Sequence, residues 1–560
     1  MADYMRMAIL GVASLALLGA QTETLSGTLL VKTLDDRAAP RTQYILVGDE
    51  DQRRVLLVLD RAPDVEPGAR VAASGRWLDK VRFRVDSLEV AERRVRTDGP
   101  LVRTPMVHRV AILAMEEANL SAEKALGEMD TMERFYDEVS RGVDRFRGNT
   151  FRKYSIDYAA NDCLYDNTDN LSDALIEAFE EDGFDADNFD HIATVVPSDC
   201  GSDWSGAWAY IGGIRNDGAP FFETVSMYKD DVYDPWYLAH ELGHNLGMNH
   251  ARSMECGGPV YYSTGGRGCS FQEYGNYNDV MGNGEGVHFS GYYQRYLGWI
   301  GAKHVVTAGR DGEFNLLPVD AGECGIQALR VPIPGEGTHY FYVEFRQARK
   351  DSTYPGTGRW GKKHRDSVLV TRSEDGNGRA PSSNTDRIEM DTGRYVGAKQ
   401  GRAYDLGNGV SVKVASIGSY ARVLITMPGN KKHRDDNGDR LLAESDGSLG
   451  ATACSTLNKH QRLEAGDYLR STNMRYTFGM SRDGNLELLK GAQTVWSADT
   501  CCSSAYAIMQ GNGGLVVYDG GDLRFSSGTA GNKGAELVVR NNGTAVILDK
   551  QGNVIWSTEQ

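Results

Sequence analysis

The feature that most constrains this chain is a cluster of three histidines, one glutamate and two glycines in one short stretch, His240-Glu241-Leu242-Gly243-His244-Asn245-Leu246-Gly247-Met248-Asn249-His250. Asp234 and Pro235 precede it, and they suit the N-cap and the first turn of a helix. His240 and His244 are four residues apart, so a helix places both imidazoles on one face, within reach of one ion. The stretch therefore predicts a helix that presents two nitrogen ligands.

The end of this stretch supplies a third nitrogen. Gly247 lets the chain leave the helix abruptly, because glycine tolerates the left-handed conformation at a helix end. His250 can then fold back toward the same ion. Three neutral imidazoles with an open fourth position are typical of catalytic rather than structural zinc. We therefore predict one catalytic Zn²⁺ held by His240, His244 and His250.

Glu241 is adjacent to a ligand but cannot easily reach the same ion, since successive side chains on a helix diverge. It is placed to hold a water molecule at the fourth position, whose pKa zinc lowers toward ~7. We predict that Glu241 takes a proton from this water as general base and later donates it to the leaving amine of a peptide. A site that retains zinc without turnover is the alternative for the same residues.

The spacing His-Glu-x-x-His-x-x-Gly-x-x-His resembles that of the metzincin zinc peptidases, whose further mark is a turn that contains methionine. The segment 273–282, which includes Met281, supplies such a turn, and with the later Tyr-Leu-Gly-Trp299 it resembles the gametolysin family. The resemblance covers about 105–300. It implies the three zinc ligands and the base named above, with Met281 as a structural floor under the metal.

Two residues near this turn are expected to stay out of the metal shell. Asn283 stands two positions after Met281, so a tyrosine as fifth ligand, as in astacins, is not expected. His288 could enter the cleft, but a packed or solvated histidine is the expectation we favour.

Residues 105–300 mix helical and strand patterns, which predicts an α/β metzincin catalytic domain. Strands are expected at Val110–Ala114, Ile192–Val196 and Phe221–Tyr228. The last of these is the candidate edge strand, onto which an extended substrate could add. Helices are expected from Met132 to Phe146 and from Leu171 to Gly183, where apolar residues recur at helical spacing.

All-β regions are expected on both sides of the catalytic domain. Residues 21–100 alternate in the manner of a small β-barrel or sandwich, and a pro-segment is one interpretation of them. They hold no cysteine, which excludes an inhibitory switch based on a thiolate. Residues 301–428 are again strand-like and predict a β-sandwich-like domain, and 429–455 form a polar linker.

The region 456–560 repeats three times. Turn glycines recur at Gly484, Gly513 and Gly543, and aromatic residues recur with a similar period at Trp496, Phe525 and Trp556. An Asx-Gly pair between apolar runs is a strong hairpin signal. Three such units predict a three-fold array that buries one aromatic side chain from each unit at its centre.

This repeat resembles the bulb-type mannose-binding lectins, which have a β-prism fold and a sugar pocket of the pattern Gln-x-Asp-x-Asn-x-Val-x-Tyr. The middle repeat keeps three of these five positions and has amide and glycine in place of the other two, in the order Gln510, Asn512, Gly514, Val516 and Tyr518. The first repeat keeps only Asp483 and Asn485, and the third keeps only the valine. The resemblance implies mannose-type glycans as partners, best at the middle repeat, with a targeting or spacer domain as the alternative.

The N-terminus and the cysteines indicate export. Residues 1–20 combine Arg6 with an apolar run that ends in small residues, which predicts a signal peptide and a secreted protein. Eight cysteines suit an oxidising compartment. Spacing favours the pairs Cys163 with Cys200 and Cys256 with Cys269, and Cys454 with Cys501 or Cys502, although sequence does not fix connectivity.

The composition excludes one further class of function. The formal net charge is −16, which argues against nucleic acid as a partner because such binding needs a clustered positive field. No later stretch is apolar enough to cross a membrane.

Taken together, these features predict a secreted zinc endopeptidase that acts on extracellular or cell-wall proteins and glycoproteins. The alternative is a secreted glycan-binding adhesin that retains a zinc site without catalysis.

Overall fold

The computed structural model of the protein divides into two compact units. The first comprises Met1–Ala302, Arg330–Lys399 and Tyr404–Val410, and the second comprises Lys303–Leu329, Gln400–Ala403 and Ser411–Gln560. The structure describes residues 22–35, 41–49, 53–63, 65, 67–92, 105–201, 206–212, 224–256, 268–284, 287–301, 304–319, 326–347, 366–374, 385–388, 397–418, 420–428, 455–465, 468–471, 475–481, 483–490, 493–502 and 504–559. The predicted signal peptide, almost all of the predicted linker, Cys324 and Cys454 lie outside these residues.

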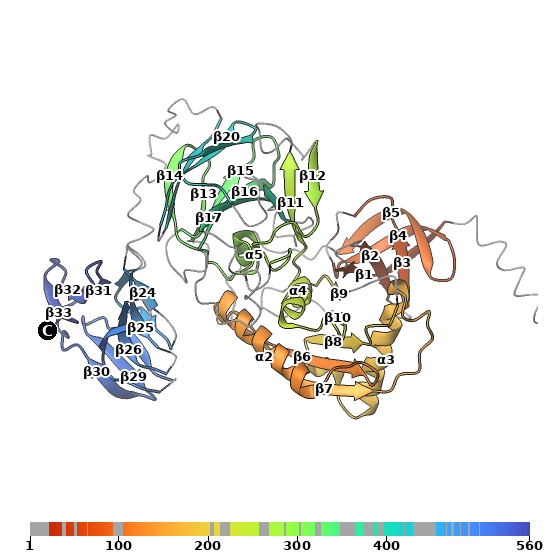
Figure 1. Ribbon diagram of the computed structural model, residues 1–560, viewed down its shortest axis with the longest axis horizontal. Helices are drawn as coiled ribbons and strands as arrows, with labels where there is room; N and C mark the ends of the chain where they lie inside the picture. Colours follow the sequence, from red (N-terminus) through yellow and green to blue (C-terminus); the bar gives the residue numbers. More distant parts are fainter. Residues whose placement is uncertain are drawn as a thin grey trace, which may run out of the picture. The chain divides into compact units, whose positions relative to one another are not determined.

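A ten-stranded sheet joins the N-terminal region to the segment that carries the three histidines (Figure 1). The N-terminal strands are β1 (Glu23–Leu34), β2 (Arg41–Gly48), β3 (Arg54–Val58), β4 (Arg70–Trp77) and β5 (Arg82–Glu92). The others are β6 (Met106–Met115), β7 (Asp144–Tyr154), β8 (His191–Val196), β9 (Ala207–Tyr210) and β10 (Thr224–Lys229). The strand order is β2-β3-β5-β4-β1-β9-β10-β8-β6-β7, so the two halves meet where β1 pairs with β9.

The prediction that Phe221–Tyr228 forms an edge strand is wrong. The strand there is β10, which pairs in parallel with β8 on one side and antiparallel with β9 on the other. Its described side chains are buried throughout, as suits a strand covered on both faces. Within this half of the sheet, β9 is the strand next to the N-terminal region, because β1 pairs with it, and β7 lies at the far end.

The described residues of the first unit include six helical segments: α2 (Ala122–Val139), η1 (Tyr165–Asn167), α3 (Thr168–Glu181), η2 (Ala186–Asn188), α4 (Pro235–Asn245) and α5 (Gly291–Tyr296). The Ser121 hydroxyl accepts the Lys124 N–H and caps α2. The predicted extension of this helix to Phe146 is wrong. Arg141 and Gly142 adopt positive φ angles of 58° and 73°, which end the helix, and Phe146 lies in β7.

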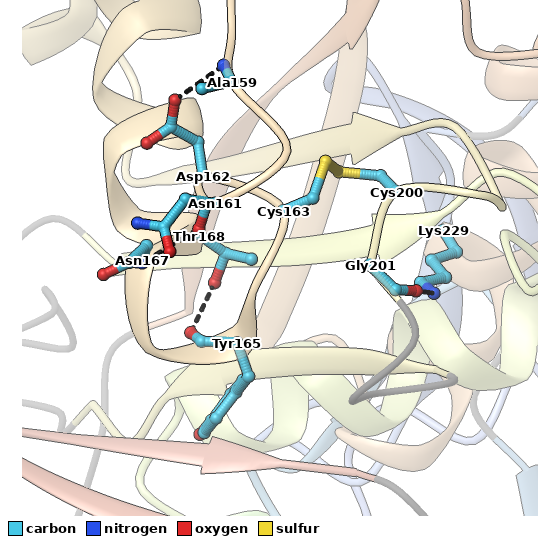
Figure 2. The surroundings of a disulfide bond; sticks show 10 residues. All are labelled: Ala159, Asn161, Asp162, Cys163, Tyr165, Asn167, Thr168, Cys200, Gly201 and Lys229. Atoms are coloured by element: carbon cyan, nitrogen blue, oxygen red, sulfur yellow. Dashed lines mark hydrogen bonds between the residues drawn. A yellow bond between two sulfur atoms is a disulfide. The ribbon is translucent and has the colours of Figure 1, made fainter.

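Two disulfides confirm the pairings that spacing favoured. Cys163 joins Cys200, which ties the segment before α3 to the end of β8 (Figure 2). Beside this bond the Lys229 ammonium donates to the Gly201 carbonyl at 2.8 Å, and the Thr168 hydroxyl donates to the Tyr165 carbonyl at 2.9 Å. Cys256 joins Cys269 and links β11 (Ala251–Cys256) to β12 (Cys269–Gln272).

Strands from the region after the histidines form a second sheet in the first unit. Its order includes β12-β11-β18-β17-β16-β15, with β15 at Ala328–Pro332, β16 at His339–Arg346, β17 at Ser367–Glu374 and β18 at Thr385–Ile388. The strand β11 directly follows His250 and pairs in parallel with β18. Further strands are β13 (Val305–Thr307), β14 (Gly312–Leu316), β19 (Ala403–Gly407), β20 (Val410–Ile417) and β21 (Ala421–Thr426), and β21 pairs with β14 and β20.

The C-terminal region forms three four-stranded sheets, as the three-fold repeat predicts. Their orders are β22-β31-β32-β33, β23-β28-β29-β30 and β24-β25-β26-β27. The strand bounds are Thr456–Leu457, Arg462–Leu463, Tyr468–Arg470, Tyr476–Met480, Leu486–Lys490, Gln493–Ser497, Tyr506–Met509, Leu515–Asp519, Asp522–Ser526, Glu536–Val539, Ala545–Leu548 and Val554–Ser557 for β22 to β33 in turn.

One aromatic side chain from each repeat meets the other two. The ring centroids of Trp496, Phe525 and Trp556 lie 5.6–6.1 Å apart. They are half-buried and pack against a core to which all three sheets contribute. The predicted meeting of the three aromatics is therefore confirmed, but their predicted burial is only partial. Among the described residues, no helix has the length and apolar character needed to cross a membrane.

Candidate metal centre

The helix α4 forms where the sequence predicts it. The Asp234 carboxylate accepts the N–H groups of Trp236 at 2.7 Å and Tyr237 at 3.0 Å, which caps the first turn, and Pro235 begins the helix. Gly247 has a φ of 94°, the left-handed conformation that ends the helix and turns the chain back. The local sequence thus sets where the helix begins and ends, and therefore where the backbone carries the three histidines.

Each of the three imidazoles is oriented through its Nδ1 atom. His240 Nδ1 lies 2.7 Å from the Val280 carbonyl oxygen, and His244 Nδ1 lies 2.7 Å from that of Met248. His250 Nδ1 lies 2.8 Å from a carboxylate oxygen of Glu273. An acceptor at Nδ1 keeps the proton there and leaves the Nε2 lone pair free, which is the usual arrangement of metal-binding histidines.

The three Nε2 atoms converge on one carboxylate, that of Asp35, at the end of β1. Asp35 Oδ2 lies 3.2 Å from His244 Nε2 and 3.5 Å from His240 Nε2, and Asp35 Oδ1 is hydrogen-bonded to His250 Nε2. One ligand atom from each of these four buried residues lies within 4.8 Å of all the others. Three nitrogens and one oxygen this close form a donor set that suits a tetrahedral zinc ion.

Unpaired polar atoms support the same interpretation. Among the described residues, Nε2 of His240, Nε2 of His244 and Oδ2 of Asp35 are buried and have no hydrogen-bond partner. Buried polar groups are almost always paired, because each unpaired one costs about 1–3 kcal/mol. A cation at their common centre would satisfy all three atoms at once. The residues present therefore fit a zinc ion.

Glu241 lies beside this centre and is fully buried. Both of its carboxylate oxygens are buried, and neither has a hydrogen-bond partner in the described part of the chain. Burial raises the pKa of Glu241 well above its ordinary value, and the negative charge of Asp35 raises it further. A carboxylate that is held at high proton affinity beside a metal can accept and return a proton.

The remaining charges of the centre act on one another. Burial opposes the ionisation of Asp35, but the three imidazoles hold its pKa well below the ordinary value. Burial lowers the pKa of His244 to about 4, which favours the neutral ring that a metal requires. Burial also disfavours the charged form of His250, but Asp35 and Glu273 outweigh it and raise its pKa to about 9.

Met281 lies directly beneath the metal-site helix. It is fully buried, and a Cβ atom added to Gly243 would lie 2.4 Å from its sulfur. Gly243 stands between His240 and His244, so the close approach of Met281 depends on the absence of a side chain there. The Asp279 carboxylate holds the turn by accepting the N–H groups of Met281 at 2.9 Å and Ser290 at 2.8 Å.

His288 packs against α2, as expected for a histidine outside the metal shell. Its Nε2 atom lies 3.5 Å from a Glu138 carboxylate oxygen, and its ring contacts Phe135 edge-on at 6.4 Å between centroids.

The sequence did not predict the roles of three residues of the centre: Asp35, Glu273 and Tyr274. The Tyr274 hydroxyl donates to Asp35 at 3.0 Å, and its ring lies 4.6 Å from that of His250.

Of the predicted sugar residues of the middle repeat, Val516 and Tyr518 lie on one face of β29, and the others lie in the turn between β28 and β29. The Gln510 amide donates to the Tyr518 hydroxyl at 3.2 Å. Val516 is buried but is not part of the hydrophobic core that the three sheets share. The side-chain oxygen Oδ1 of Asn512 accepts the N–H of Gly514 at 3.0 Å, so it closes the turn.

In the first repeat, Asp483 is exposed. The Asn485 carbonyl oxygen accepts the Thr500 N–H at 3.0 Å, and its amide donates to the Ser497 hydroxyl at 2.9 Å. The Asn485 side chain is therefore committed to bonds within the repeat.

Comparison with known proteins finds one matching family model. Residues 151–290 match the model of the metallo-peptidase family M12B, reprolysin-like. The matched range contains the three histidines and Met281. Members of that family are zinc-dependent peptidases. No curated protein matches the chain.

The similar solved structures are lectins. A Marasmius oreades lectin is 30% identical over 19% of this chain and 90% of its own, with a TM-score of 0.18. A mannose-binding lectin from Gastrodia elata is 29% identical over 19% of this chain and 97% of its own, also with a TM-score of 0.18. The mannose-specific agglutinin from snowdrop is 26% identical over 17% and 90%, with a TM-score of 0.16.

Proposed function

We propose that this protein is a secreted zinc endopeptidase of the metzincin type with a lectin-like tail. The observation that carries the proposal is the convergence of three buried Nε2 atoms beside the unpaired carboxylate of Glu241. The match to a zinc-dependent peptidase family over residues 151–290 supports it. The finer assignment to the gametolysin family rests on the turn around Met281 and on Trp299.

His240, His244 and His250 would hold the ion through their Nε2 atoms. Zinc bound there would supply a Lewis acid that lowers the pKa of water and polarises a peptide carbonyl. Glu241 accepts a proton from the attacking water, since its carboxylate is buried and has a raised pKa. It then delivers that proton to the nitrogen of the leaving amine. An adhesin with an inert zinc site would not need a buried base at this position.

The proposed substrates are extracellular or cell-wall proteins and glycoproteins. Two disulfides suit an oxidising compartment, which supports export through the predicted signal peptide. The tail, proposed to be a β-prism, would hold the enzyme near glycan-bearing substrate and raise its local concentration. The remaining sugar contacts are at Gln510, Val516 and Tyr518, because the turn uses the Asn512 oxygen.

Replacing the proposed base tests the catalytic function. Glu241→Gln should leave about one zinc ion per chain while lowering casein hydrolysis at least ~100-fold, the scale of a lost general base. Glu123→Gln, an exposed glutamate in the first turn of α2, is the matched control and should hydrolyse casein like the unmodified chain. A chain without bound zinc, or hydrolysis that Glu241→Gln does not change, would contradict the proposal.

The tail is tested separately with a single side chain. Tyr518→Ala removes the hydroxyl that binds Gln510, and we expect it to weaken retention on a mannose-bearing resin without changing peptide hydrolysis. Tyr506→Ala, on the neighbouring strand, is the control for general loss of an aromatic ring. Equal retention of the unmodified chain and of a chain without 455–560 would refute the targeting role.

A further inference from the structure

We infer that Asp35 is the fourth ligand of the metal and that the N-terminal sheet β1–β5 holds the peptidase in an inactive form. The inference rests on the proposed function, because it concerns the same metal centre. It begins with the carboxylate at the point where the three imidazoles converge. No other described acidic residue joins these histidines in a cluster able to hold a metal.

The chemistry of a fourth protein ligand is incompatible with turnover. A catalytic zinc site keeps three protein ligands and leaves the fourth position to water or substrate, whereas four protein ligands make a closed site. One carboxylate oxygen of Asp35, Oδ2, lies 3.2 Å from His244 Nε2 and 3.5 Å from His240 Nε2. While Asp35 remains there, its carboxylate would take the place that a water molecule beside Glu241 needs.

The backbone that carries Asp35 also takes the substrate's place. Residues 32–34 of β1 pair antiparallel with residues 208–210 of β9, and the Asp35 N–H donates to the Ala207 carbonyl at 2.9 Å. The β9 edge is the edge to which an extended peptide would add as a further strand. The chain thus blocks both the metal and the adjacent strand edge with one continuous segment.

Two residues of the catalytic half, by which we mean residues 105–300, contact this segment closely. A Cβ atom added to Gly206 would lie 2.7 Å from the carbonyl oxygen of Asp35, so only glycine allows the backbone to approach this closely. The Tyr274 hydroxyl donates to Asp35 Oδ1 at 3.0 Å and fixes the carboxylate. Tyr274 is a positioning residue in this state, since it acts on the metal site through Asp35.

Charged contacts anchor the N-terminal sheet to the segment around α3. The buried Lys32 ammonium lies 3.0 Å from an Asp169 carboxylate oxygen, and it also donates to the Tyr165 carbonyl and the Thr168 hydroxyl, each at 3.0 Å. Arg54 pairs with Asp173. A buried, fully bonded ammonium makes docking specific, because displacement would leave the Asp169 carboxylate without its cationic partner.

The N-terminal sheet nevertheless has a core of its own, which makes it separable. Nine buried apolar residues from Leu29 to Val85 form a cluster that includes no residue of the catalytic half. Only a few of its side chains, such as Leu34 and Ile45, reach the core that β6 and α3 share. Since residues 21–100 contain no cysteine, a carboxylate performs the blocking role that a thiolate could not.

The test uses the full zinc-loaded chain and a small zinc-binding probe, acetohydroxamate. If the closed form opens at most ~1% of the time, the probe's apparent affinity falls by ~100-fold. We therefore expect Asp35→Ala to bind the probe at least ~100-fold more tightly than the unmodified chain by calorimetry, and to hydrolyse casein without prior processing. Asp60→Ala, which removes an exposed carboxylate of the same sheet, should behave like the unmodified chain.

A second variant guards against misfolding. Asp35→Asn preserves the size of the side chain but replaces the ionised ligand with a weaker neutral one. Like Asp35→Ala, it should therefore bind the probe more tightly than the unmodified chain does. Equal probe affinity of Asp35→Ala, Asp35→Asn and the unmodified chain would overturn the inference. A failure of the proposed function looks different, because then none of the chains would bind zinc or none would hydrolyse casein after the probe site has opened.

Discussion

The metal centre and the C-terminal repeats differ in whether their polar side chains have hydrogen-bond partners. In the metal centre, the described Nε2 atoms of His240 and His244 and the oxygens of Glu241 are buried without hydrogen-bond partners. In the repeats, Asn485 bonds to Thr500 and Ser497, and Asn512 closes its own turn. An unpaired buried group is costly and is kept only where a ligand completes it. The difference is consistent with the proposed metal site, and it shows that two positions predicted to bind sugar, Asn485 and Asn512, are used in hydrogen bonds within the repeats.

The largest expected effect comes from removing one imidazole. His244→Ala should weaken zinc binding by well over ~100-fold, since loss of a mere outer-shell partner already costs about 10–100-fold. Competition with a chromophoric chelator measures the affinity, and His460→Ala in the exposed tail is the control. Unchanged zinc affinity in His244→Ala would show that the unpaired imidazoles do not bind the metal, so the two regions would not differ in this respect.

The Asp279 carboxylate should give the metal-site turn a dependence on pH. Burial raises its pKa to about 6 from an ordinary value of 3.8. A raised folded-state pKa stabilises the protonated form, so this contribution is complete below about pH 4 and is lost as the pH rises through about 6. The loss amounts to up to ~3 kcal/mol of unfolding free energy.

Asp279→Asn tests this directly, because the amide does not titrate. The difference in unfolding free energy between about pH 4 and about pH 7 should be smaller in the Asn variant, with both proteins saturated with zinc. An equal difference in the two proteins would show that Asp279 does not titrate in this range.

Gly243→Ala should destabilise the metal-site helix by about 1–3 kcal/mol, because the new methyl group overlaps the sulfur of Met281. Combining it with Met281→Ala should cost less than the sum of the two single changes, since the cavity receives the methyl group. Thermal unfolding of the four proteins measures the coupling. Strict additivity would mean that Met281 does not press on this helix.

The smallest effects concern the repeats. Asn485→Ala leaves the buried Thr500 N–H without its acceptor and should cost the tail about 1–2 kcal/mol. Gln510→Ala breaks one half-buried bond and should change stability by about 0.5 kcal/mol or less. Hydrogen exchange in β26 and β29 reports both without requiring a single global transition. A reversed order of the two costs would argue that Gln510, not Asn485, has become structural.

Local patterns were enough to predict the parts of the molecule that local sequence determines. Asp234, Pro235 and Gly247 define α4 at its start and its end, and the spacing of the histidines then fixes their common face. The three-fold tail follows from a repeat that is visible in the chain itself, as the meeting of Trp496, Phe525 and Trp556 confirms.

Long-range pairing was beyond the reach of the same patterns. Asp35 is followed by another aspartate, and nothing in the sequence distinguishes the one that meets His250, because that meeting depends on β1 pairing with β9. The placement of β10 inside the sheet depends in the same way on its antiparallel pairing with β9. Helical spacing also continued past the end of α2, since periodicity does not register the positive φ angles at Arg141 and Gly142.

A crystal structure of the full chain grown with zinc, recorded at the zinc absorption edge, tests the central claim most directly. The anomalous density should contain one peak at bonding distance, about 2.0–2.2 Å, from Nε2 of His240, His244 and His250 and from one oxygen of Asp35. A peak away from these imidazoles, or one with water at the fourth position and the Asp35 carboxylate turned aside, would contradict it.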